Sequence, residues 1–371
     1  MKKKIAVIEG DGVGPEVTRQ AVKVLNAVAN QFHHEFEYEH CLMGAVAIDK
    51  TGEPLSDKTI EICLESDAIL FGAIGDPKYD NDPTAKVRPE QGLLKLRKSL
   101  QLFANIRPVI SYPSLHHLSP LKPKYLEGAD FIIFRELTGG IYFGKKEMNE
   151  EKTFASDDCV YSREEIERIA HIAFQFAQKR KKHITLVDKA NILETSRLWR
   201  KVVQDISKEY TDVKVDFQFV DNAAMQVIVN SKQFDVVLTE NMFGDILSDE
   251  ASVISGSLGL LPSASIGKGS SLFEPIHGSY PQAAGKDIAN PIGSILSAAM
   301  MLDYFEMKEE AALVRRAVEW TLHHGFVTKD IDPVNCYSTT TIGDLIHDFI
   351  ENRAASDVNK NNMVLSKSTI I

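Results

Sequence analysis

The sequence predicts an α/β fold, because short apolar runs alternate with amphipathic stretches along the chain. Amphipathic helices are expected at 164–180 and 198–210, where apolar residues recur at helical spacing. Because the expected strands are apolar throughout, we expect a sheet that is covered on both faces. These strands are 5–8, 68–71, 130–134, 184–187 and 235–238.

Length and charge narrow the class of protein. A chain of 371 residues is longer than one core usually supports, so two domains are expected. A composition of 44% hydrophobic and 25% charged residues is that of a soluble globular protein. The net charge of -10 argues against general electrostatic binding of nucleic acid. Locally convergent arginines can still hold an anionic small molecule.

The cysteines and the N-terminus predict a cytoplasmic protein. The apolar run 5–8 that follows Lys2–Lys4 is too short for the core of a signal peptide. No apolar run approaches the length that crosses a bilayer, so no membrane partner is expected. The cysteines have no CxxC spacing, which indicates reduced thiols and neither a zinc site nor a disulfide framework. They are Cys41, Cys63, Cys159 and Cys336.

The first strand leads into a glycine-rich turn. The turn covers residues 9–14, and Pro15 suits the first position of the helix that follows. The loop 10–16, GDGVGPE, joins a strand to a helix and so invites a nucleotide-binding interpretation. It lacks the third glycine of the GxGxxG pattern, so a structural turn is the better interpretation.

A helical face that combines apolar and charged groups is expected at 90–97. Glu90, Leu93, Leu94 and Arg97 fall at i, i+3, i+4 and i+7, and therefore share one side of a helix. The face is apolar in its middle and charged at both ends.

Two further arginines follow. Arg107 lies in the sequence NIRP, and Arg135 closes the apolar strand that ends at Phe134. The end of a buried strand is where open α/β sheets place their sites. Arginine grips carboxylates with two parallel donors, so Arg97, Arg107 and Arg135 together suit a dicarboxylate. Each taken singly also suits a surface position or an ion pair.

Three more polar residues are candidates for chemistry. Tyr142 follows Arg135 in a glycine-flanked stretch, where a phenol can relay a proton or simply pack. Lys189 follows the strand 184–187 and would be a base if a metal and arginines lay beside it; otherwise it is a solvated loop lysine. Asp221 follows a strand-like run and is a metal ligand or a turn residue.

Asp245 and Asp249 are the most informative pair in the chain. They stand one helical turn apart in TENMFGDILSDEAS, residues 239–252, so both carboxylates point the same way. Two such carboxylates repel each other unless a cation lies between them. Mg²⁺ prefers oxygen ligands and often uses one or two protein carboxylates. The alternative is a capped helix start with a solvated acidic face.

Three segments lie outside the expected sheet and helices. The run 272–291 is rich in turn formers and precedes a buried helix that begins at Ile292, which favours a functional loop. The stretch from Gly139 to Tyr161 suits an extended arm, which would pair with a second subunit because a lone ribbon is marginal in water. The tail 354–371 is polar and aperiodic, so we expect it to be flexible.

Together these motifs resemble the β-decarboxylating dehydrogenases, the family of isocitrate and isopropylmalate dehydrogenases. The resemblance runs from Ile5 to about Asn352, nearly the whole chain. The motifs that carry it are long and occur in the order of the family. They are GDGVGPE at 10–16, LRKSLQLFANIRP at 96–108, VDKANILETSRLWR at 187–200, TENMFGDILSDEAS at 239–252 and GSLGLLPSAS at 256–265.

The resemblance implies a two-domain α/β fold of the isopropylmalate/isocitrate dehydrogenase type, which is not a Rossmann fold. A cofactor-side domain would comprise residues 1–102 and 255–353. A central domain would comprise residues 103–254, with a dimerisation arm near 139–160. The resemblance also implies a homodimer with a shared active site.

The resemblance implies a role for each polar candidate. Arg97, Arg107 and Arg135 would hold the carboxylates of a dicarboxylic hydroxy acid. Asp245 and Asp249 would bind Mg²⁺ or Mn²⁺ with Asp221 of the other subunit. Tyr142 and the lysine at 189 of the other subunit would move protons. The acid would be oxidised at its hydroxyl group and then lose CO₂.

The cofactor implied by the resemblance is NAD. Gln282 stands where many NAD-using relatives carry aspartate and where NADP-using relatives often carry lysine. Glutamine can hydrogen-bond a ribose hydroxyl but does not repel a phosphate. The residues implied in cofactor binding are Asp76, Glu90, Glu274, His277, Gly278, Ser279, Gln282, Ala283, Gly285, Ile288, Ala289 and Asn290.

Substrate choice within the family would depend on the helix at 90–97. Isocitrate enzymes carry polar groups where this chain has Gln91-Gly92-Leu93. Leu93 and Leu94 instead offer an apolar surface that suits an isopropyl group, whose burial contributes roughly 1.5–3 kcal/mol. Sister activities on tartrate, malate, isocitrate or homoisocitrate remain alternatives, as does a non-catalytic regulatory relative.

Overall fold

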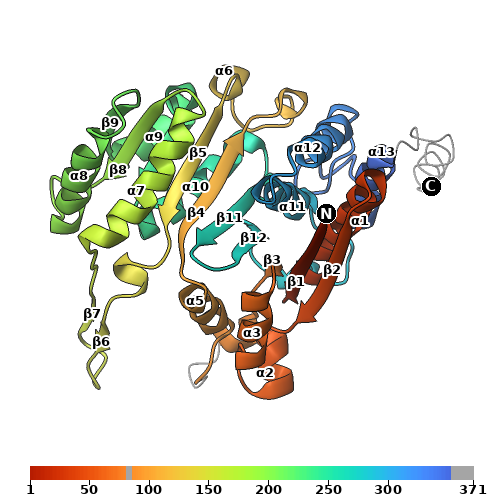
Figure 1. The fold of residues 1–371 in the computed structure, drawn as a ribbon, viewed down its shortest axis with the longest axis horizontal. Helices are drawn as coiled ribbons and strands as arrows, with labels where there is room; N and C mark the ends of the chain where they lie inside the picture. Colours follow the sequence, from red (N-terminus) through yellow and green to blue (C-terminus); the bar gives the residue numbers. More distant parts are fainter. Residues whose placement is uncertain (81–85, 352–371) are drawn as a thin grey trace.

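A ten-stranded sheet is the centre of the computed structural model, which describes residues 1–80 and 86–351 (Figure 1). The strand order is β2-β1-β3-β12-β11-β4-β5-β10-β8-β9. The predicted tail 354–371 lies outside the described residues. The strands are β1 Lys2–Gly10, β2 Glu35–Cys41, β3 Ala68–Ala73, β4 Leu102–Ile110, β5 Asp130–Glu136, β8 His183–Asp188, β9 Lys214–Phe219, β10 Val236–Thr239, β11 Pro262–Gly267 and β12 Ser271–Pro275.

The middle of the sheet is antiparallel and its two flanks are parallel. Strand β4 pairs antiparallel with both β5 and β11, and β11 pairs antiparallel with β12. The remaining neighbours, such as β1 with β3 and β8 with β10, are parallel. A doubly wound dinucleotide-binding sheet has the strand order 3-2-1-4-5-6, so this strand order with antiparallel pairs at its centre is not a Rossmann fold.

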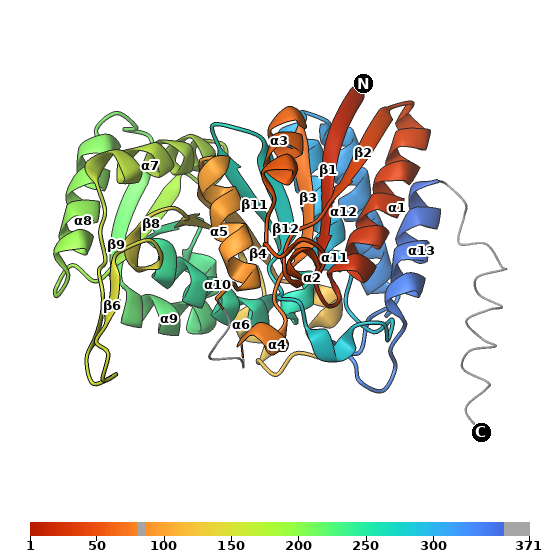
Figure 2. The ribbon, with the colours of Figure 1, turned by 90° about the horizontal axis from the view of Figure 1, so that it is seen from below.

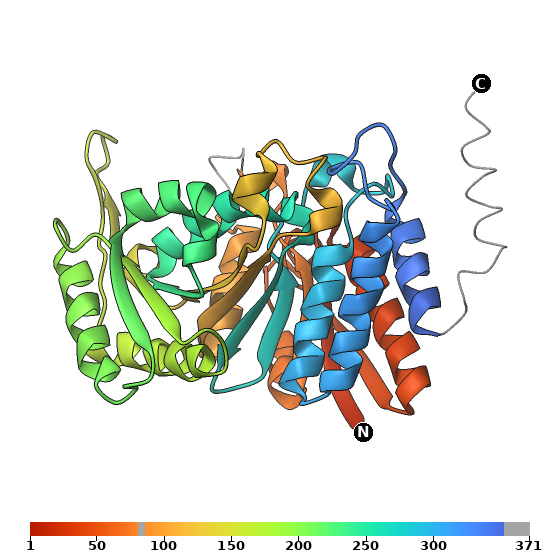
Figure 3. The same cartoon turned by 90° about the horizontal axis from the view of Figure 1, so that it is seen from above.

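Helices cover both faces, as the apolar strands predict. Figure 2 shows α7 and α8 at one end of the molecule and α1 and α13 at the other. Figure 3 shows α11 and α12 side by side over the sheet. The α-helices are α1 Gly14–Phe32, α2 Ala45–Thr51, α3 Asp57–Glu65, α4 Pro77–Asp80, α5 Pro89–Ser99, α6 Pro123–Leu126, α7 Arg163–Gln178, α8 Glu194–Ser207, α9 Val220–Val229, α10 Asn241–Ser255, α11 Ile292–Tyr304, α12 Lys308–His323 and α13 Thr339–Ile350.

Alternation along the strands sends neighbouring side chains into different cores. On β1, Ile5 and Val7 join a core that α1, α11 and α12 cover, whereas Ile8 joins a core with residues of α3 and α5. On β5, Phe134 packs with residues of α7 and α8, whereas the preceding residue, Ile133, packs with residues of α9 and α10. Because successive side chains of a strand point to opposite faces, both faces are buried.

The predicted elements are present, with some differences at their ends. The helix expected at 198–210 begins earlier, at Glu194, an acidic residue that suits the positive end of a helix. The polar run expected at 272–291 begins inside a strand, because Ser271–Pro275 form β12 and are buried in the sheet. The loop therefore starts after Pro275.

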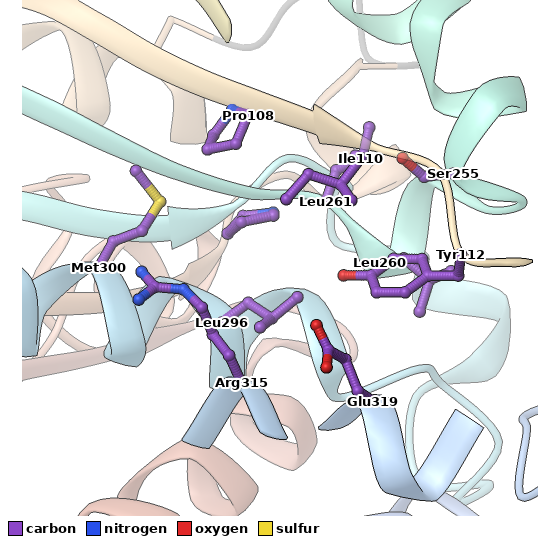
Figure 4. Close-up of a pocket in the computed structure, with 11 residues that line it drawn as sticks. Pro108, Ile110, Tyr112, Ser255, Leu260, Leu261, Leu296, Met300, Arg315 and Glu319 are labelled. Carbon is purple, nitrogen blue, oxygen red and sulfur yellow. The ribbon is translucent and has the colours of Figure 1, made fainter. Parts of the chain in front are cut away.

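The predicted arm contains a small two-stranded ribbon. Strands β6 Lys146–Met148 and β7 Ala155–Asp157 pair antiparallel and extend away from the main sheet (Figure 1). The ribbon carries exposed apolar side chains. Met148 is 65% exposed and Phe154 is 62% exposed. A small apolar cavity of about 80 Å³ lies elsewhere, between the end of β4 and helices α11 and α12 (Figure 4).

No helix within residues 1–80 or 86–351 combines the length and the apolar character needed to cross a membrane.

Candidate active site

Asp245 is the point at which the predicted polar residues converge. Its Oδ1 lies 3.3 Å from Nη1 of Arg107 and also accepts a hydrogen bond from Nη1 of Arg135. Its Oδ2 accepts a hydrogen bond of 2.8 Å from the hydroxyl group of Tyr142. Nη1 of Arg107 also lies 3.6 Å from Asp249. The structure thus brings five predicted residues together.

The strand and helix packing explains this convergence. Strands β4 and β5 pair antiparallel with Asn105 opposite Arg135, so Arg107 lies on the adjacent strand only two residues along from Arg135. Helix α10 crosses β5 at Gly244, where an added Cβ would come within 2.7 Å of Cγ of Arg135. Only glycine permits this approach, which places the next residue, Asp245, against both guanidinium groups.

The two aspartates differ in their electrostatic surroundings. Burial alone would raise the pKa of Asp245, but the guanidinium groups of Arg135 and Arg107 and the hydrogen bond from Tyr142 hold it below its usual value. Partial burial raises the pKa of Asp249, and the charge of Asp245 adds to this effect against the opposing pull of Arg107. Asp245 is therefore the more firmly ionised of the two.

The arginines and the tyrosine keep their protons at neutral pH. Burial and the nearby charge of Arg107 lower the pKa of Arg135 to about 10, which still leaves a cation. Burial also lowers the pKa of Arg107. Burial and the hydrogen bond to Asp245 raise the pKa of Tyr142, so the phenol remains a proton donor.

Arg97 reaches the site from the other flank of the sheet. It lies on α5, and its Nη2 donates a hydrogen bond of 3.1 Å to Glu274 at the end of β12. Its Nε is buried and has no hydrogen-bond partner among the described residues. Leu93 and Leu94 lie half-buried on the same helix. Gly92 packs tightly, because an added Cβ would lie 2.8 Å from the carbonyl oxygen of Pro54.

Lys189 and Asp221 form a separate pair. Nζ of Lys189 donates a hydrogen bond of 2.8 Å to Asp221, and this bond lowers the pKa of Asp221. Asp221 lies in the first turn of α9, not in a loop turn, and its side chain is 67% exposed. Within residues 1–80 and 86–351 no three metal-ligating side chains are grouped. Within one subunit, Asp221 therefore does not lie in one group with Asp245 and Asp249.

The loops predicted to bind a cofactor meet at the ends of β1, β3 and β12. The backbone N–H of Val13 donates to the carbonyl oxygen of Ser279, at 2.7 Å. A Cβ placed on Gly75 would lie 3.1 Å from Oε1 of Glu90 and 3.4 Å from Oγ of Ser279. Asp76 follows directly in the chain. The loop at Gly75 is therefore bordered by three predicted residues from distant segments, namely Asp76, Glu90 and Ser279.

A cavity of about 430 Å³ adjoins these loops. Asn290, which lines it, donates a hydrogen bond of 3.1 Å to Asp330. Nδ1 of His277 lies 2.9 Å from the carbonyl oxygen of Gly278, while its Nε2 is buried without a partner among the described residues. Burial lowers the pKa of His277, so the imidazole is neutral and Nε2 accepts. The lining residues predicted from sequence are His277, Gly278, Ile288, Ala289 and Asn290.

Other predicted cofactor residues lie outside this cavity lining. Gln282 is exposed. Ala283 is fully buried in a small core with Val13, and the N–H of Gly285 donates to Glu16. These three positions shape the loop around the cavity.

Sequence reasoning missed several residues of the site. Lys329 and Asp330 line the cavity from a late loop that carries no local motif. Asn105 and Asn241 contact Arg107 and Arg135, although each is an ordinary amide inside a recognised motif. Only their place in NIRP and at the start of α10 indicates them.

Comparisons with known proteins agree with this fold. The family model described as isocitrate/isopropylmalate dehydrogenase matches residues 4–346. A 3-isopropylmalate dehydrogenase from Bacteroides fragilis is 54% identical over 349 residues, 94% of this chain and 98% of the relative. One from Bacillus subtilis is 53% identical, over 92% of this chain and 94% of the relative.

A solved structure gives the same result for the fold. The isocitrate dehydrogenase from Methylococcus capsulatus superposes with a TM-score of 0.85 at 34% identity, covering 94% of this chain and all of that one (100%). Fold and site therefore define an oxidoreductase. The chain belongs to the isocitrate/isopropylmalate dehydrogenase family.

Proposed function

We propose that the chain catalyses the NAD-dependent oxidation and decarboxylation of (2R,3S)-3-isopropylmalate to 2-oxo-4-methylpentanoate and CO₂, a step of leucine biosynthesis. The observation that carries the proposal is the convergence of Arg107, Arg135, Tyr142 and Asp249 on Asp245. This group combines cations for carboxylates with carboxylates for a metal ion. The names of the curated relatives support the substrate.

The donor chemistry fits a hard divalent cation. Asp245 and Asp249 present carboxylates one turn apart on α10, and their side chains are 32% and 59% exposed. In the proposal they hold Mg²⁺ or Mn²⁺ together with Asp221 of a second subunit. When bound, such a cation polarises a hydroxyl or carbonyl oxygen as a Lewis acid.

The arginines position the substrate. Arg107 and Arg135 bind one carboxylate beside the aspartates, and Arg97 binds the other. Each guanidinium can make two parallel hydrogen bonds to a carboxylate, which fixes the orientation of the acid. The hydroxyl-bearing carbon is thereby held toward the cofactor loops.

Two groups move protons in the proposed reaction. Lys189 of the second subunit accepts the proton of the substrate hydroxyl group as hydride leaves the same carbon. Loss of CO₂ then leaves an enolate, and Tyr142 donates its phenolic proton to the carbon that lost the carboxylate. The raised pKa of Tyr142 keeps that proton in place until it is needed.

Helix α5 sets the substrate preference in this proposal. Leu93 and Leu94 present an apolar surface next to Arg97, which suits an isopropyl group. A third carboxylate at that place would be desolvated without a partner, at a cost larger than the gain from burial. Malate and tartrate lack the alkyl group and would leave the surface unfilled.

The cavity beside β12 suits the adenosine part of NAD. It is largely apolar, and it is lined by five of the residues predicted to bind the cofactor. Glu90 lies beside the loop of Gly75 and Asp76, and Glu274 accepts a hydrogen bond from Arg97. We therefore assign NAD as the hydride acceptor.

We infer a homodimer with a shared site, and the pairing of Lys189 with Asp221, apart from the group around Asp245, supports it. Exposed apolar side chains support a subunit interface on α9, α10 and the arm. Met225 is 53% exposed, Ile246 is 58% exposed and Phe154 is 62% exposed. We also infer a cytoplasmic location and a division into residues 1–102 with 255–353 and residues 103–254.

Hybrid dimers test the sharing directly. Lys189→Ala and Asp245→Asn subunits are each expected to be inactive alone. Mixed after denaturation, they form hybrids in which one site keeps both Lys189 and Asp245, so activity returns. If both residues act within one subunit, no hybrid has an intact site and the mixture stays inactive.

A substrate panel tests the activity. Purified protein is assayed with NAD and Mg²⁺ on 3-isopropylmalate, isocitrate, homoisocitrate, malate and tartrate, with and without EDTA. We expect 3-isopropylmalate to give the highest kcat/KM and EDTA to abolish turnover. A higher kcat/KM for another acid would assign a sister activity, and no turnover of any acid would favour a regulatory role.

A further inference from the structure

Each of the two central arginines is held by a buried asparagine. Nε of Arg107 donates a hydrogen bond of 2.6 Å to Oδ1 of Asn105. Nε of Arg135 donates one of 3.0 Å to Oδ1 of Asn241. Asn105 is 0% exposed and Asn241 is 1% exposed, so neither amide has water as an alternative partner. The arrangement occurs twice, on different elements.

The amide nitrogen of each asparagine is also anchored. Nδ2 of Asn105 donates to Oγ of Ser265 on β11, at 3.0 Å. Nδ2 of Asn241 donates to the carbonyl oxygen of Gly139, at 3.2 Å, in the turn that leads to Tyr142. With its nitrogen fixed, each amide can present only its oxygen to the arginine. The guanidinium plane is therefore fixed as well.

Fixing Nε leaves the outer nitrogens for other partners. Nη1 of both arginines points to Asp245. In the part of the chain that the structure describes, Nη2 of neither arginine makes a hydrogen bond. Guanidinium nitrogens that lack a protein partner are donors available to a carboxylate ligand.

A neutral amide suits this place better than a carboxylate would. An amide oxygen accepts the Nε hydrogen bond and leaves the positive charge of the guanidinium intact. A carboxylate at the same place would form a buried ion pair with the arginine, and its charge would oppose the carboxylate of a ligand.

We propose that Asn105 and Asn241 are positioning residues for the substrate carboxylate. They orient Arg107 and Arg135 while leaving the charge of both arginines available. Asn241 has a second role, because its bond to Gly139 ties Arg135 to the turn that carries Tyr142. The identity of the dicarboxylate rests on the proposed function, but the positioning role does not.

Asn105→Asp and Asn241→Asp test the proposal, because they change charge with little change of shape. An aspartate at 105 can accept from the hydroxyl group of Ser265, so only the arginine is affected. For Asn105→Asp we expect the substrate KM to rise by roughly tenfold or more, the equivalent of about 1.4 kcal/mol. The KM for NAD and the kcat of this variant should stay within about twofold of their original values.

Asn241→Asp is expected to differ in kcat. Its carboxylate would face the carbonyl oxygen of Gly139, and the repulsion would shift the turn at Tyr142. The substrate KM should rise as for Asn105→Asp, and kcat should fall by roughly tenfold as well. This split between the two variants follows from the different partners of the two amide nitrogens, and a general loss of packing would not produce it.

Thr321→Val is the matched control. It removes a buried hydrogen bond of 2.8 Å on α12, outside the site, with little change of shape. We expect a lower Tm and an unchanged substrate KM. An unchanged substrate KM in both asparagine variants would overturn the proposal. So would equal rises of the substrate and NAD KM in proportion to the loss of Tm.

Calorimetry gives a readout that does not need turnover. Binding of the dicarboxylate with Mg²⁺ and without NAD should weaken in both asparagine variants and not in Thr321→Val. If the substrate panel assigns another hydroxy acid, the proposed function fails and the same measurements are made with that acid. Failure of the proposed function and failure of the positioning role are thereby distinguished.

Discussion

Gly244→Ala is the sharpest single test of the site geometry. The added Cβ would lie 2.7 Å from Cγ and 2.8 Å from Cβ of Arg135, and 3.1 Å from Cγ2 of Thr239. Ordinary van der Waals contact begins at 3.4 Å, so α10 and β5 must separate by about 0.7 Å. The arginine cannot give way by rotating its outer bonds, because the clash is with the first atoms of its side chain.

The expected effects on stability and on activity differ in size. Alanine in place of a helical glycine favours the helix by about 1 kcal/mol. Overpacking opposes it by about 1–3 kcal/mol, so the net loss of stability is at most about 2 kcal/mol. A shift of about 1 Å at reacting groups can cost roughly 100-fold in rate. We therefore expect a folded protein that has lost most of its kcat/KM.

The free energy of unfolding in urea, kcat/KM and the Mg²⁺ concentration for half-maximal activity are measured for Gly244→Ala and for the original protein. Ser252→Ala, on the same helix, is the control. It should unfold like the original protein and should change neither of the two activity measurements by more than about twofold. The reasoning is refuted if Gly244→Ala keeps its original kcat/KM. It is also refuted if activity falls only as far as the folded fraction does.

Three further outcomes are expected. Gly92→Ala should push α5 away from Pro54 and raise the KM for 3-isopropylmalate more than the KM for NAD; equal changes would contradict this. Gln282→Asp should raise the ratio of kcat/KM for NAD to that for NADP, because a carboxylate repels a 2′-phosphate; an unchanged ratio would remove residue 282 from cofactor choice. Because burial lowers the pKa of His277, the stability it contributes is complete above about pH 6.5, its unfolded value, and is lost as the pH falls through its lowered folded value. The free energy of unfolding in urea should therefore differ less between pH 5 and pH 7.5 for His277→Phe than for the original protein. Equal differences would contradict a lowered pKa of His277.

Much of the fold was predictable because its signals are local. Apolar runs indicated five of the ten strands of the sheet, which are β1, β3, β5, β8 and β10. The i, i+4 spacing of Asp245 and Asp249 indicated a shared face of α10. The antiparallel pairing of β4 with β11 was not predictable, because it joins segments about 160 residues apart with no local pattern. Charged candidates were visible in the sequence, whereas the amides that orient them, such as Asn105, look like any other polar residue.

The charges of the site imply that substrate and metal bind together. Three arginines face three carboxylates, so the site is close to neutral when neither ligand is present. A dicarboxylate alone adds negative charge beside Asp245 and Asp249, and a divalent cation alone adds positive charge beside the arginines. Bound together, the two ligands cancel. The arginines are Arg97, Arg107 and Arg135, and the carboxylates are Asp245, Asp249 and Glu274.

We therefore expect Mg²⁺ to tighten binding of the dicarboxylate by roughly 5- to 150-fold, the usual range of coupling between two sites. By linkage the dicarboxylate must tighten Mg²⁺ binding by the same factor. Calorimetry without NAD measures both, and Asp249→Asn should reduce the coupling because it removes one of the charges that the cation offsets. Dicarboxylate affinity that is the same with Mg²⁺ and with EDTA would show that the aspartates do not link the two ligands.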